Sequence, residues 1–167
     1  MTGKLARRLA AIVVLGCWCS AAVAEVPEGG IAQSLPLQPL TVETQAGERD
    51  LQVQVADTDA TRQTGLMYRV SMPEAEGMLF IFQQVRPVSF WMKNTMLPLD
   101  IIFVGDDGRV INIARNTTPF SLASIPSRGP ARAVLELNAG ASRRLGIDVG
   151  DRVRYEALAL PHGERSP

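Results

Sequence analysis

Cysteine and histidine are nearly absent from this 167-residue chain. Its two cysteines, Cys17 and Cys19, lie near the N-terminus, and its one histidine, His162, lies in a polar tail. A Ser-His-Asp triad and a multi-histidine zinc site are therefore excluded from the main body of the chain by count. Cleavage after Ala24 would also remove both cysteines, and with them any disulfide or thiolate nucleophile. We accordingly expect no cofactor.

The chain also lacks an excess of charge of either sign. Seventeen basic residues balance seventeen acidic residues, so the composition gives no indication of a nucleic-acid-binding protein. Apolar residues make up 46% of the chain and charged residues 20%, which is typical of a folded globular protein and excludes a disordered one. The length corresponds to about one domain. We expect a monomer.

The N-terminus has the pattern of an export signal. Lys4, Arg7 and Arg8 precede an apolar stretch at 9–19 that is too short to span a bilayer, and small residues follow at 22–24. This pattern predicts a signal peptide at 1–24 and a periplasmic or secreted protein. In the alternative interpretation, the segment ending at Cys17 is a lipoprotein cleavage motif, and the protein is anchored to a membrane through that cysteine.

The rest of the chain divides into a leader, one domain and a tail. Residues 25–39 are rich in proline and glycine and predict a flexible leader. The domain occupies 40–160 and the polar tail 161–167. At its start, alternating apolar residues predict a hairpin from 40–45 and 51–56, and a helix capped by Thr58 or Asp59 and ending at Gly65 follows.

The remaining pattern is rich in β-structure. An irregular stretch is expected at 116–130 and a short helix at 139–145. Strand-length apolar runs occur at 78–82, 88–94, 99–105, 109–115, 132–138 and 151–160. We therefore predict a mainly β (α+β) fold, a curled antiparallel sheet or partly closed barrel of seven to eight short strands with one or two short helices.

Several dense motifs are similar to those of a known family. They are Gly65-Leu66-Met67-Tyr68-Arg69, Gly77-Met78-Leu79-Phe80, Phe90-Trp91-Met92-Lys93-Asn94-Thr95, Pro98-Leu99-Asp100-Ile101, Val134-Leu135-Glu136 and Gly150-Asp151. In this order, from Val42 to about Leu158, they resemble the family called domain of unknown function 192. The resemblance implies a β-rich, exported domain and leaves its activity open.

The segment around Trp91 is the first candidate site. If the strand alternates regularly, Trp91 and Lys93 share one face. Lys93 is one of only two lysines in the chain. In one interpretation Trp91 fills the barrel interior or lies under a loop, and Lys93 pairs with a carboxylate. In the other, Trp91 stacks on a ligand whose polar groups bind to Lys93 and Asn94.

Asp100 and Glu136 form the second candidate site, because each lies within an apolar run. A carboxylate in such surroundings is costly unless it is paired. Arg69, Lys93 and Arg132 are the candidate partners. The alternative is that Asp100 and Glu136 form a catalytic carboxylate pair, as in glycoside hydrolases.

Five methionines lie between 67 and 96. Their thioethers could bind Cu(I), or they fill gaps in the core.

Taken together, these patterns predict an exported, noncatalytic module that binds a small molecule, a glycan or a protein around Trp91, Lys93, Asn94 and Asp100, with Arg69 and Glu136 nearby. A carboxylate-dependent hydrolase, a copper binder and a purely structural domain remain the alternatives.

Overall fold

The computed structural model describes residues 30–159. The predicted signal peptide with Cys17, residues 25–29 of the leader and the tail with His162 lie outside the described residues. Within residues 30–159, no helix has the length and apolar character needed to cross a membrane.

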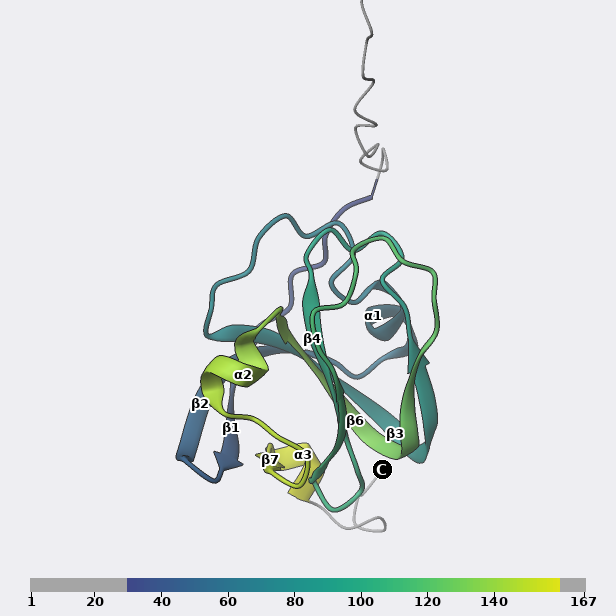
Figure 1. The fold of residues 1–167 in the computed structure, drawn as a ribbon. Coiled ribbons are helices and arrows are strands. Elements are labelled where there is room, and N and C mark those ends of the chain that lie inside the picture. The colour runs from purple at the N-terminus through teal and green to yellow at the C-terminus, as the bar shows by residue number, and fades with distance from the viewer. Residues whose placement is uncertain (1–29, 160–167) are drawn as a thin grey trace, which may run out of the picture.

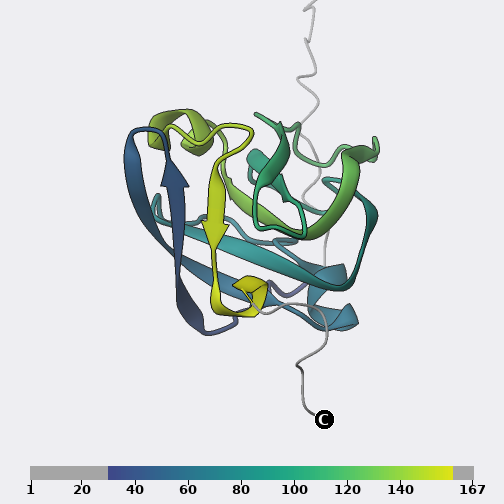
Figure 2. The ribbon, with the colours of Figure 1, turned by 90° about the horizontal axis from the view of Figure 1, so that it is seen from below.

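Seven strands form a single sheet that curls into a half-barrel (Figures 1 and 2). Neighbouring strands are antiparallel except for the parallel pair β2 and β3. The order across the sheet is β5 (Val110–Ala114), β4 (Leu99–Val104), β6 (Ile125–Asn138), β3 (Glu76–Phe90), β2 (Gly47–Ala56), β1 (Leu37–Thr44) and β7 (Arg152–Arg154). This architecture confirms the predicted mainly β fold.

The two edges of the sheet approach each other at one seam. The Val110 N–H donates to the Asp151 carbonyl at 2.8 Å, and the Val153 N–H donates to the Gly108 carbonyl at 2.8 Å. These bonds join the start of β5 and the turn before it to the start of β7, and they hold the curled sheet partly closed.

The first helix and hairpin form where the sequence predicts them. Alternating apolar residues of β1 and β2, such as Leu51 and Val53, are buried on one face. The helix α1 (Asp59–Thr64) begins at Thr58, which accepts a hydrogen bond from the Thr61 N–H in a capping box and so satisfies an otherwise unpaired donor. It ends at Gly65, whose φ of 51° lies in the left-handed region.

Hydrophobic residues fill two cores, one on each face of the sheet. The inner core receives buried side chains from all seven strands. The outer core lies on the opposite face and is covered by the segment after α1 and by the loops at 91–98 and 116–124. Because successive strand residues face opposite sides, β3, β4 and β6 supply both cores.

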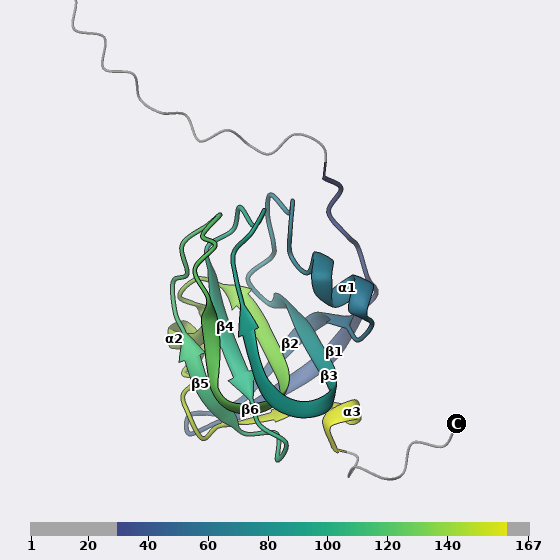
Figure 3. The ribbon, with the colours of Figure 1, turned by 90° about the vertical axis from the view of Figure 1, so that its right-hand side faces the viewer.

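The long strands β3 and β6 bend near their middle, where their register shifts between Ile81 and Arg86 (Figure 3). The bend brings the second half of β3 over the outer face of the first. Phe90 therefore packs edge-on against Phe80 and Phe103, with ring centroids 5.0 and 6.0 Å apart.

The structure corrects three details of the expected order of elements. The runs 78–82 and 88–94 belong to one bent strand, and the irregular stretch ends where β6 begins at Ile125. The last run forms only the short strand β7, followed by the helix α3 (Glu156–Ala159), because the chain leaves the sheet after Arg154. The short helix α2 (Ala141–Leu145) is present.

Candidate functional site

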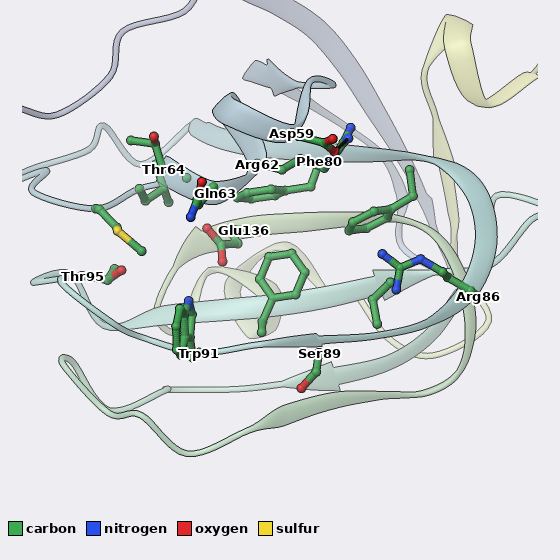
Figure 4. A pocket seen from close by; sticks show the side chains of 16 residues that line it. Asp59, Arg62, Gln63, Thr64, Phe80, Arg86, Ser89, Trp91, Thr95 and Glu136 are labelled. Atoms are coloured by element: carbon green, nitrogen blue, oxygen red, sulfur yellow. Dashed lines mark hydrogen bonds and ion pairs between the residues drawn. The ribbon is translucent and has the colours of Figure 1, made fainter.

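A pocket of about 310 Å³ lies on the outer face, between α1 and the two halves of β3 (Figure 4). Its walls carry four aromatic side chains, which are Phe80, Phe82, Phe90 and Trp91. Polar side chains from α1 and β3 surround its rim. The bend in β3 creates this pocket, since both halves of the strand contribute to its walls.

Glu136 is the one buried acidic side chain in the pocket lining. It lies opposite Met78 on β3 and Ile101 on β4, so all three residues share the outer face of the sheet. The side chain is 4% exposed and points into the pocket between Phe80 and Trp91 (Figure 4). No other side chain or backbone group of residues 30–159 hydrogen-bonds to its carboxyl or pairs with it.

Burial raises the pKa of Glu136 from 4.5 to about 8, because the charged form loses its hydration. The carboxyl is therefore mostly protonated at neutral pH. In that form it can both donate and accept a hydrogen bond, and it remains without a protein partner.

Trp91 stands at the mouth of the pocket and is 50% exposed. The Lys93 ammonium, itself exposed, lies 5.2 Å from the centroid of the indole ring, a cation–π contact. The interpretation that places Trp91 in the barrel interior is therefore wrong. One interpretation of the sequence paired Lys93 with a carboxylate, whereas the structure places its ammonium against the Trp91 ring.

The loops that hold Trp91 contain an unusual cluster of left-handed residues. Tyr68, Asn94 and Phe120 have φ values of 62°, 53° and 60°. The Tyr68 N–H donates to the Asn94 carbonyl at 2.9 Å, the Asn94 side-chain amide donates to the Tyr68 hydroxyl at 2.7 Å, and the Phe120 N–H donates to the Thr95 carbonyl at 3.1 Å. Such conformations cost about 1–3 kcal/mol each and are concentrated at functional sites. The Asn94 amide is thus used to brace these loops.

Asp100 has a different environment from Glu136. Its carboxylate accepts hydrogen bonds from the Asn116 N–H at 2.9 Å, the Ser142 N–H at 2.9 Å and the Ser142 hydroxyl at 2.6 Å. Burial alone would raise the pKa of Asp100, but these hydrogen bonds and one from the Gly140 N–H outweigh it and hold the pKa below 3.8. Asp100 therefore caps α2 as an anion.

The two carboxylates do not form a catalytic pair. Across β4 and β6, Asp100 lies opposite Leu137, whereas Ile101 lies opposite Glu136. Residues that are directly opposite share a face and successive residues alternate, so Asp100 faces the inner side and Glu136 the outer side. The expectation that Asp100 and Glu136 form a catalytic pair is therefore wrong, because the strand register places them on opposite faces of the sheet.

The two candidate arginines also bind elsewhere. Arg69 donates to the Gln33 carbonyl at 3.0 Å and to the Gln54 side chain at 2.8 Å. Arg132 donates to the Phe82 carbonyl at the bend in β3. Both side chains brace the backbone, and neither forms the ion pair that the sequence predicts for the buried carboxylates.

The family model described as Uncharacterized ACR, domain of unknown function 192 (DUF192), matches residues 41–155. The chain belongs to this family. No curated protein matches it.

Two solved structures are similar to this DUF192 domain. One, from Sinorhizobium meliloti 1021, is described as a candidate transcription regulator. It is 44% identical to this chain, the match covers 75% of this chain and 97% of the Sinorhizobium chain, and the TM-score is 0.70. The other is a protein of unknown function from Novosphingobium aromaticivorans DSM 12444. It is 42% identical to this chain, the match covers 79% of this chain and 94% of the Novosphingobium chain, and the TM-score is 0.72.

Three of the five methionines between 67 and 96 are buried in the outer core, whereas Met67 and Met96 are half-buried. Met78 and Met92 are fully buried in the outer core, where the Thr117 hydroxyl donates to the Met92 sulfur at 3.2 Å. Within the described part of the chain, no group of three histidine, cysteine, aspartate or glutamate residues is arranged to hold a metal ion.

The sequence interpretation did not anticipate that α1 forms a wall of the pocket. Arg62 on this helix donates to the carbonyls of Asp57 and Ile81 and pairs with Asp59 at 2.5 Å. Its guanidinium carbon also lies 5.8 Å from the centroid of the Phe82 ring. A helix of only six residues gives no periodic signal for the element that it contacts, so the pattern alone could not place it.

Proposed function

We propose that this DUF192 domain is a noncatalytic module that binds a small molecule in the pocket beneath Trp91, with Glu136 as its principal polar contact. The observation that supports this proposal is the buried Glu136 carboxyl, which has no partner within residues 30–159. Its oxygens open onto the pocket, since the one wholly buried side-chain nitrogen or oxygen without a partner in residues 30–159 is Asn112 Oδ1. A ligand in the pocket could therefore hydrogen-bond to this carboxyl, as the few polar groups of ligand pockets generally do.

The shape of the pocket favours a small ligand over a glycan chain or a protein segment. A volume of about 310 Å³ is at the lower end of the range for small-molecule sites. Aromatic walls would bury the apolar part of the ligand, and the half-exposed Trp91 could cover it at the mouth. The hydrogen-bonded loops around Asn94 would keep this arrangement preformed, which reduces the entropy lost on binding.

The predicted signal peptide at 1–24 is the basis for a further part of the proposal, that the domain acts outside the cytoplasm. The description of the Sinorhizobium protein as a candidate transcription regulator suggests a different role. The balanced charge of this chain, with 17 basic and 17 acidic residues, gives no support for DNA binding. We therefore favour an extracytoplasmic small-molecule binder.

A fragment screen by ligand-observed NMR tests the proposed function. Wild-type protein and the variants Glu136→Gln and Trp91→Ala are each screened against the same library of small polar aromatic and aliphatic fragments. Tyr155→Phe is the matched control, because Tyr155 lies outside the pocket and hydrogen-bonds to Gln38. Fragments that bind the wild type and the control but bind both pocket variants at least tenfold more weakly support the proposal. Hits that bind all four proteins equally, or a screen without hits, contradict it.

A further inference from the structure

We propose that the pocket takes a small organic cation, an ammonium group on a flat apolar body, with Glu136 as its counterion. This inference rests on the proposed function, because it names the ligand class of the same pocket. The inference is carried by the surroundings of the Glu136 carboxyl. This acidic group is buried and has no partner among the described residues, and aromatic rings line the pocket that it faces (Figure 4).

The aromatic walls suit a cation better than a neutral or anionic group. The face of an aromatic ring carries negative charge and attracts ammonium groups, most strongly where water is excluded. Trp91 already illustrates this preference, because the Lys93 ammonium lies 5.2 Å from the centroid of its ring. Phe80 and Phe90, whose ring centroids lie 5.0 Å apart, also line the pocket.

The other charged groups around the pocket are more exposed than Glu136, already paired with a partner of opposite charge, or on the opposite face of the sheet. On α1, Arg62 is paired with Asp59 and bonded to two backbone carbonyls. On β3, Arg86 is exposed and lies at the far end of the pocket from Trp91 (Figure 4). On β4, Asp100 faces the opposite side of the sheet. Water screens exposed charges far more than buried ones, so Glu136 dominates the field inside the pocket.

Binding of a cation should therefore be linked to loss of a proton from Glu136. Burial raises the pKa of the free carboxyl to about 8, so below that pH the proton must leave before an ion pair forms. The affinity for a cation should rise about tenfold per pH unit up to about pH 8 and become constant above it. A neutral ligand of the same shape should show no such dependence.

Three probes of matched shape test this inference: benzylamine, benzyl alcohol and benzoate. Each is titrated at pH 6, 7 and 8 into the full chain and into Glu136→Gln, with the indole N–H signal of Trp91 as the readout and Trp91→Phe used to assign it. We expect benzylamine to bind most tightly at pH 8 and about fiftyfold more weakly at pH 6, because about half of the carboxyl is ionised at pH 8 and about 1% at pH 6. In Glu136→Gln its affinity at pH 8 should fall at least tenfold and lose its pH dependence. Benzyl alcohol should bind the wild type with the same affinity at all three pH values.

Arg86→Gln serves as the charge control and should change the benzylamine affinity less than threefold. The inference would be overturned if benzoate bound more tightly than benzylamine, or if benzylamine binding did not depend on pH. In that case, binding of benzoate or benzyl alcohol would still support the pocket as a small-molecule site. If none of the three probes binds, the inference is wrong, whereas the fragment screen decides independently whether the pocket binds other small molecules. Thermal unfolding at each pH shows that every variant is folded.

Discussion

Replacement of Glu136 by glutamine should make the protein more stable, and the gain should grow with pH. The two side chains have nearly the same shape, but glutamine cannot ionise. The substitution therefore removes only the cost of a buried carboxyl whose charged form is disfavoured by burial. Most substitutions destabilise a protein, so a gain at a buried position is a specific test of this environment.

The magnitude follows from the difference in pKa between the folded and unfolded states. The folded pKa of Glu136 is about 8, above the ordinary value of 4.5 expected when the chain unfolds. Below pH 4.5 the carboxyl is protonated in both states and has no effect. As the pH rises from 4.5 to 8, only the unfolded state ionises, and folding becomes less favourable by about 1.4 kcal/mol per pH unit. The loss is roughly 3 kcal/mol at pH 7 and roughly 5 kcal/mol above pH 8.

Urea unfolding of the wild type and Glu136→Gln at pH 5, 7 and 9 measures this effect as the difference in free energy of unfolding. The difference should be below about 1 kcal/mol at pH 5 and reach several kcal/mol at pH 9. Glu76→Gln is the matched control, because Glu76 begins the adjacent strand β3 and is only half-buried. A difference for Glu136→Gln that is the same at all three pH values, or that has the opposite sign, would refute the reasoning.

Three further substitutions test other parts of the structure by urea unfolding. Asp100→Ala should lower the free energy of unfolding by roughly 3–5 kcal/mol, because it leaves several buried donors unsatisfied. Since the folded pKa of Asp100 lies below 3.8, the stabilisation from its carboxylate is present above about pH 4 and lost at lower pH. A loss below about 1 kcal/mol at pH 7 would contradict this prediction. Trp91→Ala should cost only about 1–2 kcal/mol, since the side chain is half-exposed; a loss of 3–5 kcal/mol would indicate a buried ring. Gly77→Ala should cost more than about 2 kcal/mol, because its Cβ would lie 2.6 Å from the Glu136 carbonyl oxygen, and an unchanged midpoint would show that the strands can separate.

Much of the local structure follows from the sequence alone. Alternation of apolar residues placed the β1–β2 hairpin, and Thr58 and Gly65 marked the ends of α1, because side-chain period and helix capping depend on residues a few positions apart. The same local patterns indicated a curled, mainly β sheet. They also singled out Trp91 and Glu136, since an aromatic cluster and a carboxylate within an apolar run are visible without any tertiary information.

Only the tertiary structure decided what these residues do. The sequence could not show that Asp100 and Glu136 face opposite sides of the sheet, because the register of β4 against β6 depends on strands separated by β5 and a long loop. Nor could it show the bend that folds β3 over its own outer face and creates the pocket. Trp91 is exposed because the strand ends at Phe90 and the following loop is held by hydrogen bonds to distant segments. Side-chain period is a local property, whereas register, strand bending and burial arise from contacts between residues far apart in the chain.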